Sequence, residues 1–253
     1  MAGIDVLKEE IGGCTKCPLA ETRNNSVPGE GNTSARIALI GQAPGEEEDK
    51  EGRVFVGRSG EILNSLLENA GVSRNNLYIT NLIKCFLPKY RRPKRNEIDQ
   101  CSAYLDKEIY LVKPEFLVPL GYYPARYILK KYGLTVPEDK PEIFNRLWYN
   151  RGQKIYPLGH PAALVYDKSL REKTMKDYEK LRVFSSNCKW FSACPMRRFY
   201  REGELDKMWI EKYCRGDWES CRRYEMEGKG EPHPDWMLPD GSTSDRLKNL
   251  TQN

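Results

Sequence analysis

The chain has 253 residues and a formal net charge of +5, a length that allows one domain of about 150–200 residues and a smaller appendage. Its first residues, "MAGIDVLKEEIGG", lack the apolar core of a signal peptide, and no later stretch has the roughly 18 uncharged apolar residues of a membrane span. The composition therefore argues against a secreted or membrane-spanning class and predicts a cytoplasmic protein, while the mild basic excess is a weak sign of a polyanionic partner.

Short apolar runs alternate with helical periodicity over the first 180 residues. In chain order we expect a strand in 35–42, a helix in 59–72, a strand in 76–84, a helix in 96–112, a strand in 114–121, a helix in 123–133, a strand in 154–163 and a helix in 170–184. This alternation predicts an α/β fold with a mostly parallel sheet wrapped by helices. Ligands of such sheets bind beyond the carboxyl ends of the strands.

The character of the chain changes after about residue 184, where cysteine, aromatic and charged residues become dense and aliphatic residues scarce. A module of about 50 residues with so few aliphatic side chains needs a staple in order to fold. We therefore predict two domains, 1–184 and 185–253, the second held by metal and ending in a polar, frayed tail.

Eight cysteines in a reducing compartment favour metal or redox sites over disulfides. The first set has a tight pair and two distant members, which suits either tetrahedral zinc or a [4Fe–4S] cluster. Spacing alone does not choose between them. The members of this set are Cys14, Cys17, Cys85 and Cys101.

Blocks around these cysteines resemble the family 4 uracil-DNA glycosylases. The blocks are "GCTKCPLAETRNNSVPGEG", "GQAPGEEEDKEGRVFVGRSGEILNSLL", "LYITNLIKC", "RRPKRNEIDQC" and "LGHPAALVYDKSLREK", in the order of that family. The resemblance covers about residues 7 to 183. It implies a three-layer sandwich, a structural [4Fe–4S] cluster on the four cysteines, and excision of uracil from DNA.

The resemblance also implies a uracil pocket with Gly41 in its wall. Phe55 would stack on the base, Asn81 would bind N3–H and O4 through its amide, and His160 would lie beside O2, where a donor stabilises the departing anion. Without the resemblance, the alternatives are a core residue for Phe55, a turn cap for Asn81 and a structural histidine for His160.

The chain departs from the family at Gln42, where the family usually has Glu. An amide cannot take a proton from water, so we expect weakened hydrolysis with Gln42 still part of the catalytic and uracil-binding site. Among the acidic residues that follow, Glu48 matches the position that would orient the attacking water. The alternative is a solvated acidic run.

The segment between Cys85 and Cys101 carries five cations, which we interpret as contacts to the nucleic-acid backbone. A merely solvated basic loop is the alternative. The cations are Lys89, Arg91, Arg92, Lys94 and Arg95.

The second set of cysteines has gaps wider than those of zinc fingers, so we favour a second [4Fe–4S] cluster over zinc. Aromatic residues of this segment would pack around it as a minimal core, and the resemblance does not extend to this module. The second set is Cys188, Cys194, Cys214 and Cys221.

The sequence thus predicts a monomeric DNA repair enzyme that flips uracil out of single- or double-stranded DNA, hydrolyses its N-glycosidic bond and leaves an abasic site. One alternative is a glycosylase-like module that binds a base in nucleic acid without cutting it. The other is an enzyme directed at RNA or tRNA.

Overall fold

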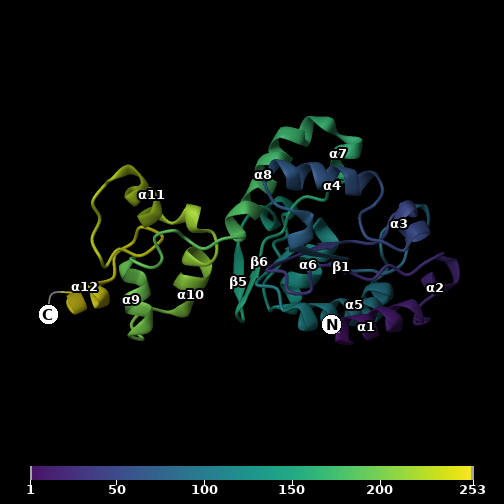
Figure 1. The fold of residues 1–253 in the computed structure, drawn as a ribbon, viewed down its shortest axis with the longest axis horizontal. Helices are drawn as coiled ribbons and strands as arrows, with labels where there is room; N and C mark the ends of the chain where they lie inside the picture. Colours follow the sequence, from purple (N-terminus) through teal and green to yellow (C-terminus); the bar gives the residue numbers. More distant parts are fainter. Residues whose placement is uncertain (1, 252–253) are drawn as a thin grey trace. The chain divides into compact units, whose positions relative to one another are not determined.

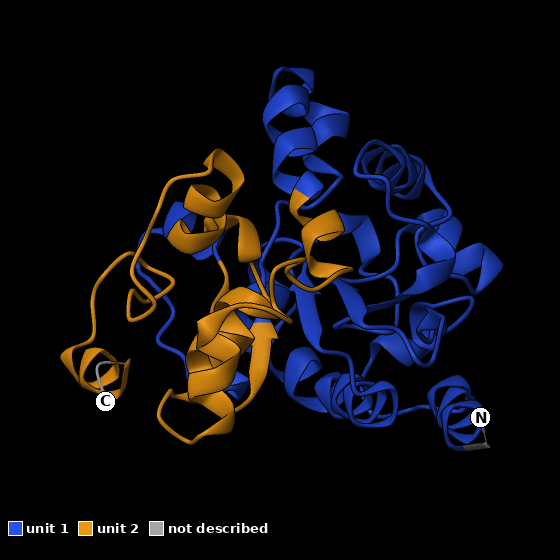
Figure 2. Cartoon of the chain, turned by 60° about the vertical axis from the view of Figure 1, so that its left-hand side comes forward, with its two compact units in different colours: residues 1–146, 155–179 blue, residues 147–154, 180–253 orange. Residues whose placement is uncertain are grey.

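The computed structural model describes residues 2–251, and the chain divides into two compact units (Figures 1 and 2). Unit 1 comprises Met1–Arg146 and Ile155–Glu179, and unit 2 comprises Leu147–Lys154 and Lys180–Asn253. This division falls inside helix α8 (Arg171–Phe184), whereas the predicted boundary lies at its end. Independent folding of the two predicted domains stays a prediction.

A mostly parallel sheet forms the centre of unit 1. Strand β2 (Ile37–Gly41) pairs in parallel with β3 (Leu77–Asn81) and with β4 (Phe116–Pro119), and the short β1 (Glu30–Gly31) is antiparallel to β3. The segment 155–158 runs along the other side of β4. Every residue of β2, β3 and β4 is buried, as in a parallel sheet covered on both faces.

Helices cover both faces of this sheet. They are α1 (Ala2–Gly12), α2 (Leu19–Thr22), α3 (Glu46–Glu51), α4 (Arg58–Asn69), α5 (Arg95–Val112), α6 (Tyr122–Lys131) and α7 (Ala163–Tyr166). Figure 1 shows α4 and α7 on one side and α1 and α5 on the other. The predicted α/β sandwich is confirmed. Within residues 2–251, no helix is long and apolar enough to cross a membrane.

The helices follow the hydrophobic spacing of the sequence. In α4, Leu63, Leu66 and Leu67 are buried on one face, and the chain turns at Gly71, whose φ of +67° suits glycine. Helix α1 was missed, although its buried residues Ile4, Leu7 and Ile11 recur at helical intervals.

Unit 2 consists of short helices with few strands. Its elements are β5 (Trp148–Asn150), β6 (Gln153–Ile155, whose last residue belongs to unit 1), α9 (Pro195–Arg201), α10 (Lys207–Trp209), α11 (Arg222–Lys229) and α12 (Asp245–Thr251). The segment Ile210–Cys214 forms a single π-helical turn after α10.

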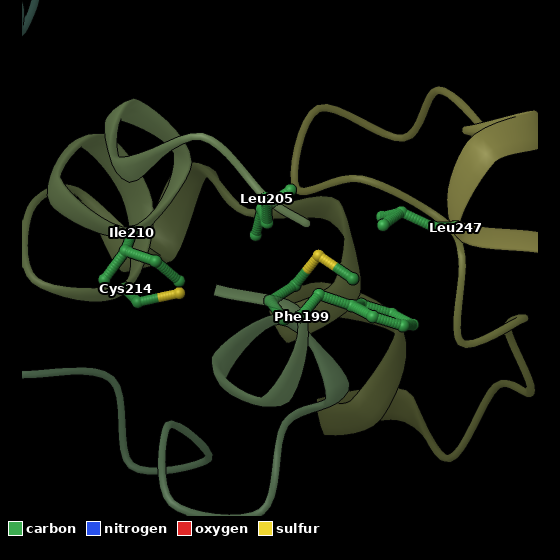
Figure 3. Packing of buried hydrophobic residues seen from close by; sticks show 6 residues of the cluster. Phe199, Leu205, Ile210, Cys214 and Leu247 are labelled. Carbon is green, nitrogen blue, oxygen red and sulfur yellow. The ribbon is translucent and has the colours of Figure 1, made fainter. Parts of the chain in front are cut away.

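A small core of unit 2 is centred on aliphatic side chains and one phenylalanine (Figure 3). Phe199, Leu205, Ile210 and Leu247 are all at least nine-tenths buried, and Cys214 packs among them. Aromatic residues such as Trp209 lie at the margin of this core. Of the aromatic residues expected around the second cysteine set, Trp190, Phe191, Trp218 and Tyr224 line the cavity that these cysteines share.

The frayed tail that we predicted is wrong for residues 245–251. These residues form α12, and Leu247 is 1% exposed within the core of unit 2 (Figure 3). Burial of one apolar residue, Leu247, thus stabilises a helix in a segment that is mostly polar. Residues 252–253, also part of the predicted tail, lie outside the described residues.

Candidate base-binding pocket and cysteine sites

A cavity of about 660 Å³ opens at the carboxyl ends of β2 and β3, where the α/β pattern predicts a ligand. The structure brings most of the predicted site residues to this cavity from separate parts of unit 1. Gly41, expected in the wall, is not among its lining residues. The predicted residues that line the cavity are Gln42, Glu48, Phe55, Asn81, Arg91 and His160.

Asn81 ends β3 and is 2% exposed. Its Oδ1 atom is buried and has no hydrogen-bond partner within the described part of the chain. A Cβ atom on Gly41, the last residue of β2, would lie only 2.2 Å from this Oδ1, so any other residue at 41 would displace the amide. The amide therefore faces the cavity as an acceptor that still needs a donor.

Phe55 has a φ of +52°, which is unusual for a residue other than glycine. Arg74 stabilises this backbone conformation, because its guanidinium donates hydrogen bonds to the carbonyls of Val54 (2.7 Å) and Phe55 (3.3 Å). The ring stacks on the His160 ring with a centroid distance of 5.9 Å and an interplanar angle of 29°. This strained backbone presents a flat aromatic surface to the cavity.

His160 is half-buried, and desolvation lowers its pKa to about 4. The ring is therefore neutral at physiological pH. Its Nδ1 accepts a hydrogen bond from the backbone N–H of Ala162 at 3.1 Å. In a neutral ring with Nδ1 as acceptor, Nε2 carries the hydrogen and can donate to a ligand.

Glu48 is 7% exposed, and its carboxylate accepts hydrogen bonds from three backbone N–H groups. Oε2 accepts from Gly45 at 2.9 Å, while Oε1 accepts from Val56 at 3.0 Å and Gly57 at 2.9 Å. The alternative of a solvated acidic run does not hold for Glu48. The carboxylate ties the loop after β2 to the loop that carries Phe55.

The predicted basic loop is only partly loop, because Arg95 is the first residue of α5. Arg91 pairs through both nitrogens with the buried carboxylate of Glu97 and also lines the cavity. The ion pair with Glu97 shows that Arg91 stabilises the conformation of this segment. Arg92 is exposed, and so are the other three predicted cations, Lys89, Lys94 and Arg95.

A buried ion pair behind the pocket was missed by the sequence reasoning. Lys84 Nζ lies 2.6 Å from Glu108 Oε2, and both side chains are 2% exposed. The same Nζ donates to the backbone oxygen of Asn81 at 2.8 Å and to Thr80 Oγ1 at 2.6 Å. A lysine inside the otherwise apolar run "NLIKC" was the available signal, because a lysine is rarely buried without a partner.

The first four cysteines line one small cavity in unit 1. Cys85 accepts a hydrogen bond from Arg23 Nη1 at 3.2 Å, and Cys101 accepts one from the backbone N–H of Lys84 at 3.2 Å. Burial raises the pKa of Cys101 to about 11, with the Lys84 charge and N–H acting in the opposite direction. Loading of this site with metal would therefore release protons.

Arg23 connects these cysteines to the pocket. Its Nη2 also donates to the carbonyls of Gly12 and Cys14 at 3.0 and 2.9 Å. The next residue, Asn24, donates through its side chain to the buried carboxylate of Asp49 at 2.6 Å. Asp49 follows Glu48 in α3, and Glu48 binds the loop that carries Phe55. A continuous series of hydrogen bonds and neighbouring residues, which we call the hydrogen-bonded frame, therefore links the cysteine site to the Phe55 loop.

The second four cysteines line a cavity of about 220 Å³ in unit 2. Cys194 and Cys221 immediately precede α9 and α11, where helix N-termini favour thiolates, and Cys214 ends the π-helical turn. The backbone N–H of Cys188 donates to the Cys214 carbonyl at 2.9 Å, and this hydrogen bond places the two cysteines next to each other.

All eight cysteines are free thiols. Within residues 2–251, no three His, Cys, Asp or Glu side chains are arranged to bind a single metal ion. The two sets thus form two separate thiol-lined cavities, one in each unit.

Comparison with known proteins identifies the first unit. The chain is 40% identical over 186 residues to a type-4 uracil-DNA glycosylase of Sulfurisphaera tokodaii, covering 72% of this chain and 84% of that protein. It is 37% identical to a type-4 uracil-DNA glycosylase of Thermotoga maritima, covering 72% of this chain and 94% of that protein. The sequence of residues 28–182 matches the family model of the uracil DNA glycosylase superfamily. The chain therefore belongs to the uracil-DNA glycosylase superfamily.

Proposed function

We propose that this chain removes uracil from DNA by flipping the nucleotide into the pocket of unit 1 and hydrolysing the N-glycosidic bond, which leaves an abasic site. The observation that carries the proposal is the buried, unpartnered Oδ1 of Asn81 in a cavity that also contains Phe55 and His160. The relatives are named type-4 uracil-DNA glycosylases, which supports the same activity here.

Asn81 would select the base. Its Oδ1 accepts the N3–H of uracil, and its Nδ2 donates to O4. Cytosine presents an acceptor at N3 and a donor in place of O4, so the same amide would leave two buried polar pairs mismatched. The hydrogen bond from Lys84 to the backbone oxygen of Asn81 supports a fixed backbone position from which this side-chain amide extends.

Phe55 and His160 would hold the base and stabilise the leaving group. The Phe55 ring stacks on the flat pyrimidine, and the His160 Nε2–H donates to O2, where negative charge develops as the glycosidic bond breaks. The low pKa of His160 supports a neutral donor that does not have to lose its proton during the reaction.

Hydrolysis would rely on this charge stabilisation more than on a strong base. Gln42 lines the cavity but cannot accept a proton from water. Glu48 would position the loops through its three backbone contacts and, with its remaining lone pairs, orient the attacking water. We expect slower hydrolysis than in an enzyme with a carboxylate at position 42.

The exposed cations beside the pocket would bind the DNA backbone. These are Lys89, Arg92, Lys94 and Arg95, whereas Arg91 would support the segment through Glu97. Such contacts suit single- and double-stranded DNA alike, since both carry the same negatively charged phosphate backbone. A monomeric state and a cytoplasmic location are part of this proposal.

The first cysteine set fits a [4Fe–4S] cluster. Four thiols surround one cavity, and Arg23 and the Lys84 N–H direct hydrogens at two of the sulfurs, as donors around iron–sulfur clusters do. Cys14, Cys17, Cys85 and Cys101 would hold the cluster, whose contribution is to crosslink the helices and loops behind the pocket.

The second set, Cys188, Cys194, Cys214 and Cys221, would hold a second [4Fe–4S] cluster in preference to zinc. Its support is that all four thiols line one cavity and that two of them begin helices. Its contribution would be to the folding of unit 2, whose apolar core is small.

An excision assay on cluster-loaded full-length protein tests the proposed function. A single-stranded oligonucleotide with one uracil should be cleaved by alkali after incubation, and matched oligonucleotides with thymine or cytosine should stay intact. Alkali cleaves RNA by itself, so a uracil-containing RNA oligonucleotide is assayed for release of free uracil instead, and none should be released. The proposal would be overturned by intact uracil DNA with tight binding, which identifies a base-binding module, or by release of uracil from the RNA alone.

A further inference from the structure

The cavity of unit 2 contains more than four cysteines. Its wall also includes His233 and Arg223, which the sequence analysis did not connect with the cysteines. The side chain of His233 is 6% exposed. A buried imidazole beside four thiols is an unexplained polar group, because neither ring nitrogen has a hydrogen-bond partner within the described part of the chain.

The nearest acidic oxygen does not satisfy His233. Glu227 Oε1 lies 3.1 Å from Nε2, within the distance of an ion pair, but the two groups do not have the geometry of a hydrogen bond. An unsatisfied buried polar group costs about 1–3 kcal/mol. A group bound in the cavity that accepts a hydrogen bond would remove this cost.

Arg223 explains why the histidine lies in this position. Its side chain is 3% exposed, and Nη1 donates to the carbonyls of Pro234 at 2.8 Å, Asp235 at 3.2 Å and Met237 at 2.8 Å. These carbonyls belong to the segment that follows His233 directly. The arginine therefore fastens this segment to α11, while its Nε remains buried and without a partner in residues 2–251.

We propose that His233 is a hydrogen-bond donor to the sulfur atoms of a [4Fe–4S] cluster held by the second cysteine set, with the Nε–H of Arg223 as a second donor. This inference rests on the second cluster of the proposed function. Four cysteines already supply one ligand to each of four irons, so the histidine is left to donate. A neutral imidazole has one N–H in either tautomer.

Such donors have a defined physical effect on a cluster. Reduction adds negative charge to the cluster, and hydrogen bonds to its sulfurs stabilise that charge, which makes the midpoint potential more positive. Removal of the His233 donor should therefore make the potential of this cluster more negative without removing iron.

The test compares His233→Phe with His233→Gln in the full-length protein after anaerobic reconstitution with ferrous iron and sulfide. Wild type and both variants should contain about eight irons per chain, as two [4Fe–4S] clusters require. In a mediated redox titration, one of two reduction steps should shift to a more negative potential in His233→Phe. His233→Gln, which keeps an N–H, should restore most of the wild-type value.

A matched control changes the same wall without changing a donor. Met196→Leu replaces a buried apolar residue of this cavity by one of similar size and should leave both reduction steps in place. Equal potentials in wild type and His233→Phe would overturn the donor role, and loss of iron in His233→Phe would identify the histidine as a ligand instead.

The readouts separate this inference from the proposed glycosylase. About four irons per chain, or zinc at the second set, would overturn the second cluster and the inference with it. Uracil excision in the same preparations would be unaffected by that result, whereas intact uracil DNA with two well-behaved clusters would overturn only the glycosylase.

Discussion

Each of the two cysteine-lined cavities has its own set of four thiols, and the surroundings of the two sets differ. The first lies in unit 1, whose strands β2, β3 and β4 are completely buried, and Arg23 and Lys84 connect it to residues of the base pocket. The second lies in a unit of short helices whose apolar core is small. A cluster bound in the first cavity should therefore affect the base pocket of unit 1, whereas a cluster bound in the second should be required for unit 2 to fold.

The largest expected effect is that of Cys214→Ala. Cys214 belongs both to the thiol-lined cavity and to the apolar core of unit 2, so its loss removes a cluster ligand and a core contact together. We expect unit 2 to lose its folded structure and half of the iron, while uracil excision by unit 1 persists. Iron analysis, circular dichroism and the excision assay measure these outcomes. Full helical content with half of the iron would contradict a folding role for the second cluster.

Lys84→Met should have the next largest effect, because it leaves the Glu108 carboxylate buried without its cation. Such a loss costs about 3–5 kcal/mol. We expect a lower Tm and a reduced kcat for uracil excision, since Asn81 also loses a backbone contact. The double variant Lys84→Met, Glu108→Gln is the matched control, because glutamine removes the charge but keeps an acceptor for the backbone N–H of Gly29. It should recover much of the stability but not the kcat if Lys84 positions Asn81, and recovery of both would remove that role.

Cys85→Ala should remove the first cluster but leave the sheet of unit 1 in place. We expect a cost of about 2–5 kcal/mol, comparable to loss of a native crosslink. Excision should fall because Arg23 loses its sulfur partner and the frame through Asp49 loosens. Thermal unfolding and iron content provide the measurement. An unchanged Tm with half of the iron would contradict the crosslinking role of the first cluster, whereas complete unfolding of unit 1 would show that the two cavities do not differ in the way proposed.

Asn81→Asp should change selectivity more than stability. The carboxylate cannot donate to O4 of uracil but can accept from the amino group of cytosine, so the preference for uracil should fall by about 5- to 150-fold, as expected for about 1–3 kcal/mol. Competition between uracil and cytosine oligonucleotides measures the ratio. Asn75→Asp, at an exposed position outside the pocket, adds the same charge as a control. An unchanged ratio would exclude Asn81 from base selection.

The smallest effect concerns His160 and pH. Its pKa is lowered from 6.5 to about 4 in the folded protein, so between these values the unfolded chain binds a proton that the folded chain does not. The stability from this source is complete above about pH 6.5 and decreases as the pH falls towards 4. The Tm of His160→Asn should fall less than that of wild type between pH 7 and pH 5. Parallel Tm curves would contradict a desolvated, neutral imidazole at position 160.

The secondary-structure elements that the sequence predicted correctly are those whose pattern lies within one segment. The apolar run of β2 and the spacing of Leu63, Leu66 and Leu67 in α4 are local patterns, and both elements form as expected. Tertiary packing decided the rest. Leu247 is one apolar residue in a polar segment, and its helix is stable because that residue meets the core of unit 2. Glu48 belongs to an acidic run, but only the fold brings three backbone N–H groups to its carboxylate.

The amino-acid sequence by itself determined the α/β frame, the eight thiols and the family motifs, because periodicity, residue chemistry and motif order are properties of the linear chain. Only the tertiary structure decided that Asn81 is left with an unpartnered acceptor, that Lys84 supports it from behind, and that His233 joins a cavity of cysteines. Burial and hydrogen-bond geometry depend on residues far apart in the chain, and no local pattern contains them.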